Sequence, residues 1–363
     1  MGKYSDKKDK EWAYWLKHPR TGLSFGYIDY GNRKKIGESF TLMPFIEFNL
    51  LSNRRFVANV GLGTSYFTKK YSPISNPENK AITTHYTWAF RLFFHYEIID
   101  ADILNLDIGV GYFHQSNGHI RLKNEGLNSI FASTSVSFDF NANPTVTQEQ
   151  FTETIPEKSS STYLDFRLGI GVNVLSELLN DRREVYTAAL MMGKTYNKTF
   201  KLGLGLFYRF YENYYEYIKS PGELVEKNYA EFMQQPYRYS TNYNVNLNVE
   251  VVLNHIGLTW QIGYNLYKPF YEVERQVGQA YTYHVHTPNG PVKIYEYGDL
   301  DFNYKLKKAI STRLGLRLYL LSTEMNPALN VYLDAAINAN FGQADFGEFS
   351  LGLVHQFDFT SQT

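Results

Sequence analysis

The sequence contains no cysteine, no excess of charge of either sign and no long apolar run, and each absence excludes a class of protein. Without cysteine there is no disulfide framework, thiol nucleophile or thiolate metal site. The 36 basic and 36 acidic side chains balance to a formal net charge of +0, whereas a nucleic-acid partner requires a concentrated basic excess. A membrane-spanning helix needs about 20 mainly apolar residues in a row, so only closed β-strands could carry this chain through a bilayer.

Aromatic side chains, by contrast, are abundant. The chain has 31 Tyr and 26 Phe among its 363 residues, and its aromatic fraction is 17%. Transmembrane barrels concentrate such side chains in girdles where the hydrocarbon meets the lipid headgroups. A soluble β-sandwich rarely needs so many, so the composition favours a barrel in an outer membrane.

Apolar and polar side chains alternate with a period of two along much of the chain. Between Phe200 and Phe210 the even positions are apolar or aromatic, whereas Lys201 and Arg209 occupy odd positions. A barrel wall requires this pattern, because successive side chains point alternately to lipid and to the lumen. The alternation predicts strands at roughly 22–30, 38–49, 56–67, 84–97, 103–116, 127–140, 162–175, 185–195, 200–210, 243–253, 257–268, 310–320, 328–339 and 346–359.

These fourteen strands, with twelve as the reserve count, predict an all-β fold. We expect one transmembrane antiparallel up-and-down β-barrel formed by residues 21–363, after a periplasmic segment at 1–20. Residues 141–161 do not fit, because they would make a long periplasmic loop or mark a miscounted strand. The other long connections all fall outside, as in bacterial barrels; they lie near 68–83, 213–242 and 269–306.

Charged side chains recur at positions predicted to face the lumen. We expect them to form an ion-pair network that fills the barrel, although a water-filled channel would need the same charges, and a passive pore remains an alternative. The tyrosine-rich run at 211–217 is assigned to the girdle and a loop. The predicted lumenal residues are Arg167, Arg209, Arg313, Arg317, Asp165, Glu250 and Asp334.

Three polar side chains occupy positions predicted to face lipid. His114 and Ser116 continue the apolar row of their strand, and residues at i and i+2 share one face. Asn128 belongs to the corresponding row of the next strand, which places it beside the pair across the hairpin. Because each unpaired polar group facing acyl chains costs on the order of 1–3 kcal/mol, this cluster indicates a function.

A hydroxyl beside an imidazole indicates ester hydrolysis. Ser116 would act as the nucleophile and His114 as the general base. The oxyanion of the intermediate would need donors, for which the candidates are Asn117, Asn124 and the backbone N–H of Gly118. A lipid substrate would reach an outward-facing site without leaving the membrane.

The His-x-Ser-Asn-Gly stretch at 114–118, followed by Asn-x-Gly-Leu at 124–127, resembles the active-site segment of the lipid A 3-O-deacylases, the PagL family. It is also similar to the longer PagL-related acyloxyacyl hydrolases of Bacteroidetes-type outer membranes. The resemblance covers residues from about 103 to 140. It implies a bacterial outer-membrane enzyme that removes an ester-linked acyl chain from lipopolysaccharide of the outer leaflet. It further implies a Ser-His-Glu triad without metal or other cofactor, with His114 as base, Ser116 as nucleophile and Asn124 as an oxyanion donor.

Two features depart from this family. Its members are eight-stranded and shorter, and Asn128 stands where the family has its acidic residue. A neutral amide can orient the imidazole but stabilises the imidazolium less, and Glu125 would supply a carboxylate if the loop folds back. The alternative is therefore a catalytically silent barrel, serving as a structural subunit in a complex with other outer-membrane proteins.

Overall fold

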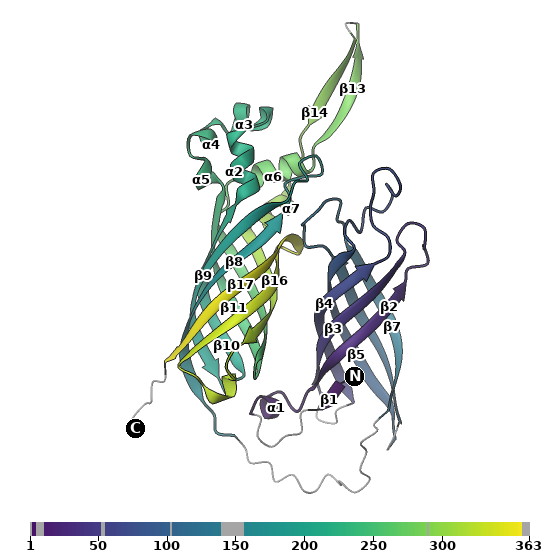
Figure 1. Cartoon of the computed structure of the whole chain (residues 1–363), viewed down its shortest axis with the longest axis vertical. Helices are drawn as coiled ribbons and strands as arrows, with labels where there is room; N and C mark the ends of the chain where they lie inside the picture. Colours follow the sequence, from purple (N-terminus) through teal and green to yellow (C-terminus); the bar gives the residue numbers. More distant parts are fainter. Residues whose placement is uncertain are drawn as a thin grey trace. The chain divides into compact units, whose positions relative to one another are not determined.

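The computed structural model describes residues 2–4, 11–51, 55–101, 104–138, 156–288 and 290–357. Antiparallel strands make up most of this part of the chain (Figure 1). None of its helices is long and apolar enough to cross a membrane. The chain divides into two compact units. Unit 1 comprises Met1–Asn117, Lys123–Ser159 and Asn197–Thr199, and unit 2 comprises Gly118–Leu122, Ser160–Tyr196 and Phe200–Thr363.

Unit 1 is built around one antiparallel sheet in which each strand pairs with the next along the chain. Side chains alternate between the two faces, and in β7 every second residue from Asn128 to Phe138 is exposed. A five-residue helix, α1 (Glu11–Trp15), precedes β2. The strands are β1 (Gly2–Tyr4), β2 (Arg20–Asp29), β3 (Glu38–Asn49), β4 (Phe56–Phe67), β5 (Tyr86–Asp100), β6 (Leu104–Ser116) and β7 (Leu127–Phe138).

Unit 2 contains a closed barrel of eight strands. The barrel closes where β17 pairs with β8, from Gly347 opposite Val172 to Phe357 opposite Thr162. The strands, in chain order, are β8 (Ser160–Asn173), β9 (Arg183–Tyr196), β10 (Phe200–Tyr211), β11 (Thr241–Leu253), β12 (Ile256–Tyr267), β15 (Ile310–Tyr319), β16 (Leu329–Asn340) and β17 (Gln343–Phe357).

Short helices and a projecting hairpin occupy the connections at one end of this barrel (Figure 1), whereas the 3₁₀ turn η1 lies at the other end, where Thr323 Oγ1 donates to Asn254 O at 2.7 Å. Tyr214, which was assigned to girdle or loop, is instead buried in a helical cap and stacks on Tyr211 and Phe270 with centroid distances of 4.4 Å. The elements are α2 (Glu212–Lys219), α3 (Glu223–Asn228), α4 (Ala230–Gln234), α5 (Pro236–Tyr239), α6 (Tyr271–Gly278), β13 (Tyr281–Thr287), β14 (Gly290–Glu296), α7 (Phe302–Ala309) and the 3₁₀ turn η1 (Thr323–Met325).

The predicted all-β, antiparallel barrel fold is confirmed, and each of the fourteen predicted strands is present, as β2–β12 and β15–β17. The strand number of the barrel was not correct. Instead of one barrel over 21–363, six of these strands lie in the sheet of unit 1 and eight close the barrel of unit 2. Alternation shows which side chains share one face of a strand. It does not show which strand pairs with the last strand of a sheet. The last two residues of the anomalous segment 141–161 belong to β8, and residues 141–155 lie outside the described part of the chain.

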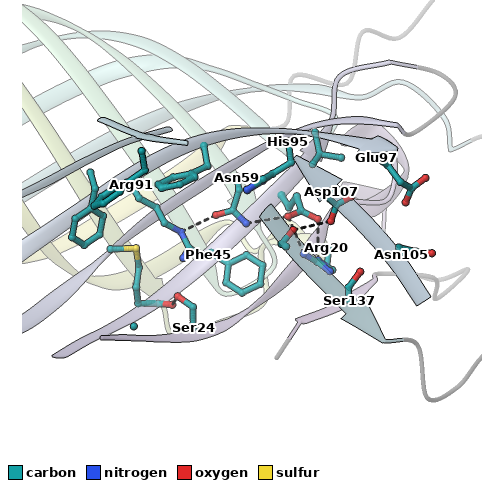
Figure 2. Close-up of a pocket in the computed structure, with 18 of the residues that line it drawn as sticks. Arg20, Ser24, Phe45, Asn59, Arg91, His95, Glu97, Asn105, Asp107 and Ser137 are labelled. Atoms are coloured by element: carbon teal, nitrogen blue, oxygen red, sulfur yellow. Dashed lines mark hydrogen bonds and ion pairs between the residues drawn. The ribbon is translucent and has the colours of Figure 1, made fainter. Parts of the chain in front are cut away.

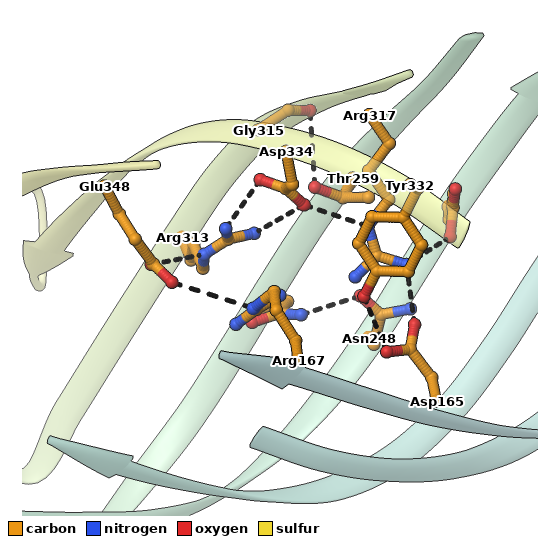
Figure 3. Close-up of polar contacts among 12 residues, drawn as sticks. Asp165, Arg167, Asn248, Thr259, Arg313, Gly315, Arg317, Tyr332, Asp334 and Glu348 are labelled. Carbon is orange, nitrogen blue, oxygen red and sulfur yellow. Dashed lines mark hydrogen bonds and ion pairs between the residues drawn. The ribbon is translucent and has the colours of Figure 1, made fainter. Parts of the chain in front are cut away.

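Buried charged side chains fill the barrel of unit 2 (Figure 3). Arg313 bridges two carboxylates, with Nη2 2.6 Å from Asp334 Oδ1 and Nε 3.0 Å from Glu348 Oε2. Arg317 Nη1 is 2.8 Å from Asp165 Oδ2. A low-dielectric interior tolerates such charges only when they compensate one another, so the predicted lumenal network is confirmed, with Glu348 as an additional member. Its buried residues are Arg167, Arg313, Arg317, Asp165, Glu250, Asp334 and Glu348; the predicted Arg209 is also buried but pairs with Asp345, whose Oδ2 is 3.9 Å from its Nη1.

Candidate active site

The hairpin of β6 and β7 carries the candidate site on one face of the unit 1 sheet. We call this the outer face; it is the face on which Val110 of β6 is 59% exposed, whereas Gln115 on the opposite face is buried. His114 and Ser116 share the register of Val110, because alternate residues of a strand point to the same side. Asn128 lies directly opposite His114 in the β6–β7 pairing. The predicted register of all three residues is therefore present in the structure.

Hydrogen bonds join these three side chains into a row. His114 Nε2 is 3.0 Å from Ser116 Oγ, and His114 Nδ1 is 2.7 Å from Asn128 Oδ1. Because an amide oxygen can only accept, Nδ1 carries the proton and Nε2 presents its lone pair to the serine hydroxyl. This is the arrangement that a general base requires.

Tyr112 is a fourth member of the row and was not among the site residues predicted from the sequence. Its hydroxyl donates to Asn128 Oδ1 at 2.6 Å. Tyr112 precedes His114 by two residues, so it shares the outer face. The signal that could have revealed it is the continuous i, i+2 spacing of Tyr112, His114 and Ser116.

The segment 124–126 covers the serine, which is only 3% exposed. At Gly126, where φ is +71°, an added Cβ would lie 3.3 Å from Ser116 Cβ and 3.3 Å from His114 Cε1. The Gly126 N–H donates to Ala81 O at 3.1 Å, which ties the segment to the β4–β5 connection. Both the backbone conformation and the close approach therefore require glycine at position 126.

The predicted oxyanion donors lie on the chain that follows Ser116. The backbone N–H of Asn117 donates to Asn124 Oδ1 at 3.1 Å, so these two residues are in contact. This bond occupies the Asn117 N–H and fixes the Asn124 side chain by its oxygen, so that Nδ2 is the donor end of the amide. Gly118 comes next in the chain, with a positive φ of +69°.

Glu125 is the candidate that the structure does not bring into the row. It is exposed, and its backbone N–H donates to Lys80 O at 3.2 Å. The Nδ1 atom of His114 is instead paired with Asn128, which occupies the position expected for the acidic residue.

A cavity of about 400 Å³ lies on the inner face of the same sheet, lined by side chains of β2–β7 (Figure 2). Its polar groups bond to one another: Arg20 Nη2 is 3.0 Å from Glu47 Oε2, and Asn59 Nδ2 is 3.1 Å from the same oxygen. Arg91 Nε donates to Asn59 Oδ1 at 2.9 Å. Neither His114 nor Ser116 lines this cavity, so the wall of the sheet separates it from the outer row.

The fold and the hairpin define an outer-membrane β-barrel protein whose N-terminal unit carries a hydroxyl–imidazole–amide row on its outer face. Residues 2–137, most of unit 1, match the family model described as Lipid A 3-O-deacylase (PagL), so this part of the chain is similar to that family. The β-barrel fold and this match agree with the predicted location in a bacterial outer membrane.

Solved outer-membrane proteins show distant similarity. Neisserial surface protein A is 12% identical with a TM-score of 0.25, and the match covers 56% of this chain and 100% of that one. Outer membrane phospholipase A from Escherichia coli is also 12% identical, with a TM-score of 0.18, over 96% of this chain and 98% of that one. No curated protein matches the sequence.

Proposed function

We propose that unit 1 hydrolyses an ester-linked acyl chain of lipid A, with Ser116 as nucleophile, His114 as general base and Asn128 as the residue that orients the imidazole. The observation that carries this proposal is the continuous row of hydrogen bonds, 3.0 Å from Ser116 to His114 and 2.7 Å from His114 to Asn128. The family match over residues 2–137 supports the substrate class. The outer-face position supports a lipid substrate, because an acyl chain in the outer leaflet would meet the exposed side chains of Tyr112 and Asn128, next to the covered Ser116.

Each proton transfer of the proposed reaction takes place at Nε2 of the His114 imidazole. Ser116 Oγ adds to the ester carbonyl carbon while its proton passes to His114 Nε2. The imidazolium then returns that proton to the departing sugar oxygen, and an acyl-serine remains. Water attacks the acyl carbon and gives a proton to Nε2, which returns it to Ser116 Oγ as the fatty acid leaves.

Charge develops on the carbonyl oxygen and on the imidazole during these steps. Asn124 Nδ2 and the Gly118 N–H are the proposed donors to the oxyanion. Asn128 holds the Nδ1 proton but brings no negative charge to the imidazolium, so we expect slower turnover than a carboxylate would give.

Mass spectrometry of lipid A after incubation with the purified full-length chain tests the proposal. We expect the loss of one ester-linked acyl chain with the native chain and none with Ser116→Ala. A matched control is Thr134→Ala, which removes an exposed hydroxyl of the neighbouring strand β7 and should leave the activity unchanged. An unaltered lipid A, or equal loss with Ser116→Ala, would exclude the proposed mechanism.

A structural role in an outer-membrane complex is the second candidate. It is favoured by the neutral Asn128 and by the additional unit 2, whose closed barrel is filled with buried ion pairs. This function predicts that the chain purified from native membranes carries a stoichiometric protein partner. It also predicts that the acylation of lipid A is the same with native Ser116 and with Ser116→Ala.

A further inference from the structure

We infer that Tyr112 is a positioning residue that determines which end of the Asn128 amide faces His114. The inference rests on the proposed function, because it assigns a role within the same row. Tyr112 Oη lies 2.6 Å from Asn128 Oδ1, and His114 Nδ1 lies 2.7 Å from the same oxygen. Two donors therefore converge on one acceptor.

An amide differs from a carboxylate because its two ends have opposite hydrogen-bonding character. If the Asn128 amide turned over, Nδ2 would donate to His114 Nδ1, and the imidazole proton would reside on Nε2. That N–H would then donate to Ser116 Oγ, and the serine would have no base. Both networks contain the same number of bonds among Asn128, His114 and Ser116, so these three residues alone do not select the productive one.

Tyr112 makes the two networks unequal. In the observed arrangement its hydroxyl hydrogen has an acceptor, Asn128 Oδ1. In the reversed arrangement that hydrogen would meet an N–H group and lose this acceptor. Tyr112 lies in the outward row of β6 with Val110, where acyl chains offer no other hydrogen-bond acceptor. The loss of the hydrogen bond from the Tyr112 hydroxyl is therefore not compensated. The phenol therefore favours the tautomer in which Nε2 accepts the serine proton.

A carboxylate at position 128 would not need Tyr112 to select its orientation, since both of its oxygens accept hydrogen bonds. The structure therefore predicts that the effect of Tyr112→Phe depends on the residue at position 128. In the native background we expect Tyr112→Phe to lower kcat for lipid A deacylation about tenfold, with KM unchanged. In an N128D background the same substitution should change kcat less than about twofold.

Tyr96→Phe is the matched control for these kinetics, because Tyr96 is an outward-facing tyrosine of β5 that is 43% exposed and lies outside the row. An equal loss of kcat from Tyr112→Phe in both backgrounds, or no loss in the native one, would overturn the inference. Equal loss would indicate that the phenol only anchors the hairpin.

The histidine tautomer provides a readout that does not require turnover. In ¹⁵N-histidine NMR spectra of the full-length chain, with the His114 signals assigned from an H114Q sample, we expect the proton on Nδ1. Tyr112→Phe should shift a measurable fraction to Nε2, and N128D should restore Nδ1. If the native chain leaves lipid A intact, the proposed function fails while this measurement still decides the role of Tyr112. An unchanged tautomer in Tyr112→Phe would contradict that role.

Discussion

Asn128 places a neutral amide beside Nδ1 of the His114 imidazole. A carboxylate at this position would both orient the imidazole and stabilise the positive charge of the imidazolium. Asn128 Oδ1 holds the Nδ1 proton of His114 at 2.7 Å, so orientation is provided. In the proposed reaction the ring becomes an imidazolium when Ser116 attacks, and no side chain of the row carries a compensating negative charge. The row can therefore position the base well but stabilises its protonated form weakly.

Asn128→Asp should increase deacylation. The substitution keeps an oxygen beside His114 Nδ1 and adds the missing charge, so we expect kcat to rise about tenfold. Rates measured with purified variants on lipid A check this expectation. Asn124→Asp is the comparison, because it removes a proposed oxyanion donor and should lower the rate. A fall in kcat for Asn128→Asp would show that the neutral amide itself is required.

Gly126→Ala should reduce activity through local crowding. A Cβ at this position would press on Ser116 and His114, each 3.3 Å away. Gly31→Ala is a matched control, because Gly31 has nearly the same φ of +73° but no atom within 4 Å of the added Cβ. Both variants should lose about 1 kcal/mol of stability from the left-handed conformation. Only Gly126→Ala should lose deacylation; equal rates for the two variants would refute the covering role of this segment.

Much of the candidate site could be predicted from the sequence, because a period of two leaves only two possible faces for His114, Ser116 and Asn128. The role of Tyr112 could not, since a tyrosine in a lipid-facing row is equally typical of an aromatic girdle. The bond from the Asn117 N–H to Asn124 Oδ1 depends on how the connection after Ser116 turns. Such turns are governed by backbone angles that alternation does not specify.

At the scale of elements, the strands and the helices differed in how far they could be predicted. Each strand shows its own alternation, so the positions of β2–β12 and β15–β17 follow from local sequence. The cap helices are only four to eight residues long, too short for a clear helical period. They are stabilised instead by packing, as in the stack of Tyr211, Tyr214 and Phe270. That contact joins α2 to the residue before α6, and the local sequence pattern does not predict it.

The cap should loosen as the pH rises, because of Glu274 in α6. Burial raises the pKa of Glu274 to about 7, and Tyr214 Oη donates to its carboxyl group at 2.5 Å. A raised pKa means that the folded cap favours the protonated acid. The stabilisation is complete below the ordinary pKa of 4.5 and is lost as the pH passes through about 7.

Hydrogen exchange of the α2 and α6 amides, compared between native and Glu274→Gln chains at each pH, measures this effect. We expect the native cap to lose protection relative to the variant between pH 5 and 8. Glu216→Gln, at an exposed position of α2, should follow the native chain. Parallel behaviour of the native and Glu274→Gln chains would show that Glu274 does not control the cap.

At the scale of the whole molecule, the chain combines two β units with different interiors. Unit 1 has a cavity of about 400 Å³ on the inner face of its sheet, whereas the barrel of unit 2 is filled by arginines paired with carboxylates. The sequence predicted the strands and the charges of this arrangement but not its division. Closure depends on the pairing of β17 with β8, between residues that lie far apart in the chain. Local alternation contains no information on such a pairing.

The filled barrel should not conduct ions. Arg317 alone contacts Asp165, Glu250 and Asp334 at 2.8, 3.0 and 2.9 Å, and all four side chains are buried. Ions could pass only by displacing these contacts, which a low-dielectric interior makes costly. Planar-bilayer recordings of the full-length chain should therefore show no stable channel. Reproducible single-channel steps would revive the passive pore as a function.

Covalent trapping tests most directly whether the outer row acts on esters through Ser116. A long-chain fluorophosphonate, which reacts with activated serine hydroxyls, would be added to the full-length chain in detergent, and the modified peptide located by mass spectrometry. The account predicts one label, on Ser116, that is absent in His114→Ala and that forms in step with the loss of lipid A deacylation. Deacylation that persists in a chain fully labelled at Ser116, or a label on another serine that abolishes it, would contradict the account.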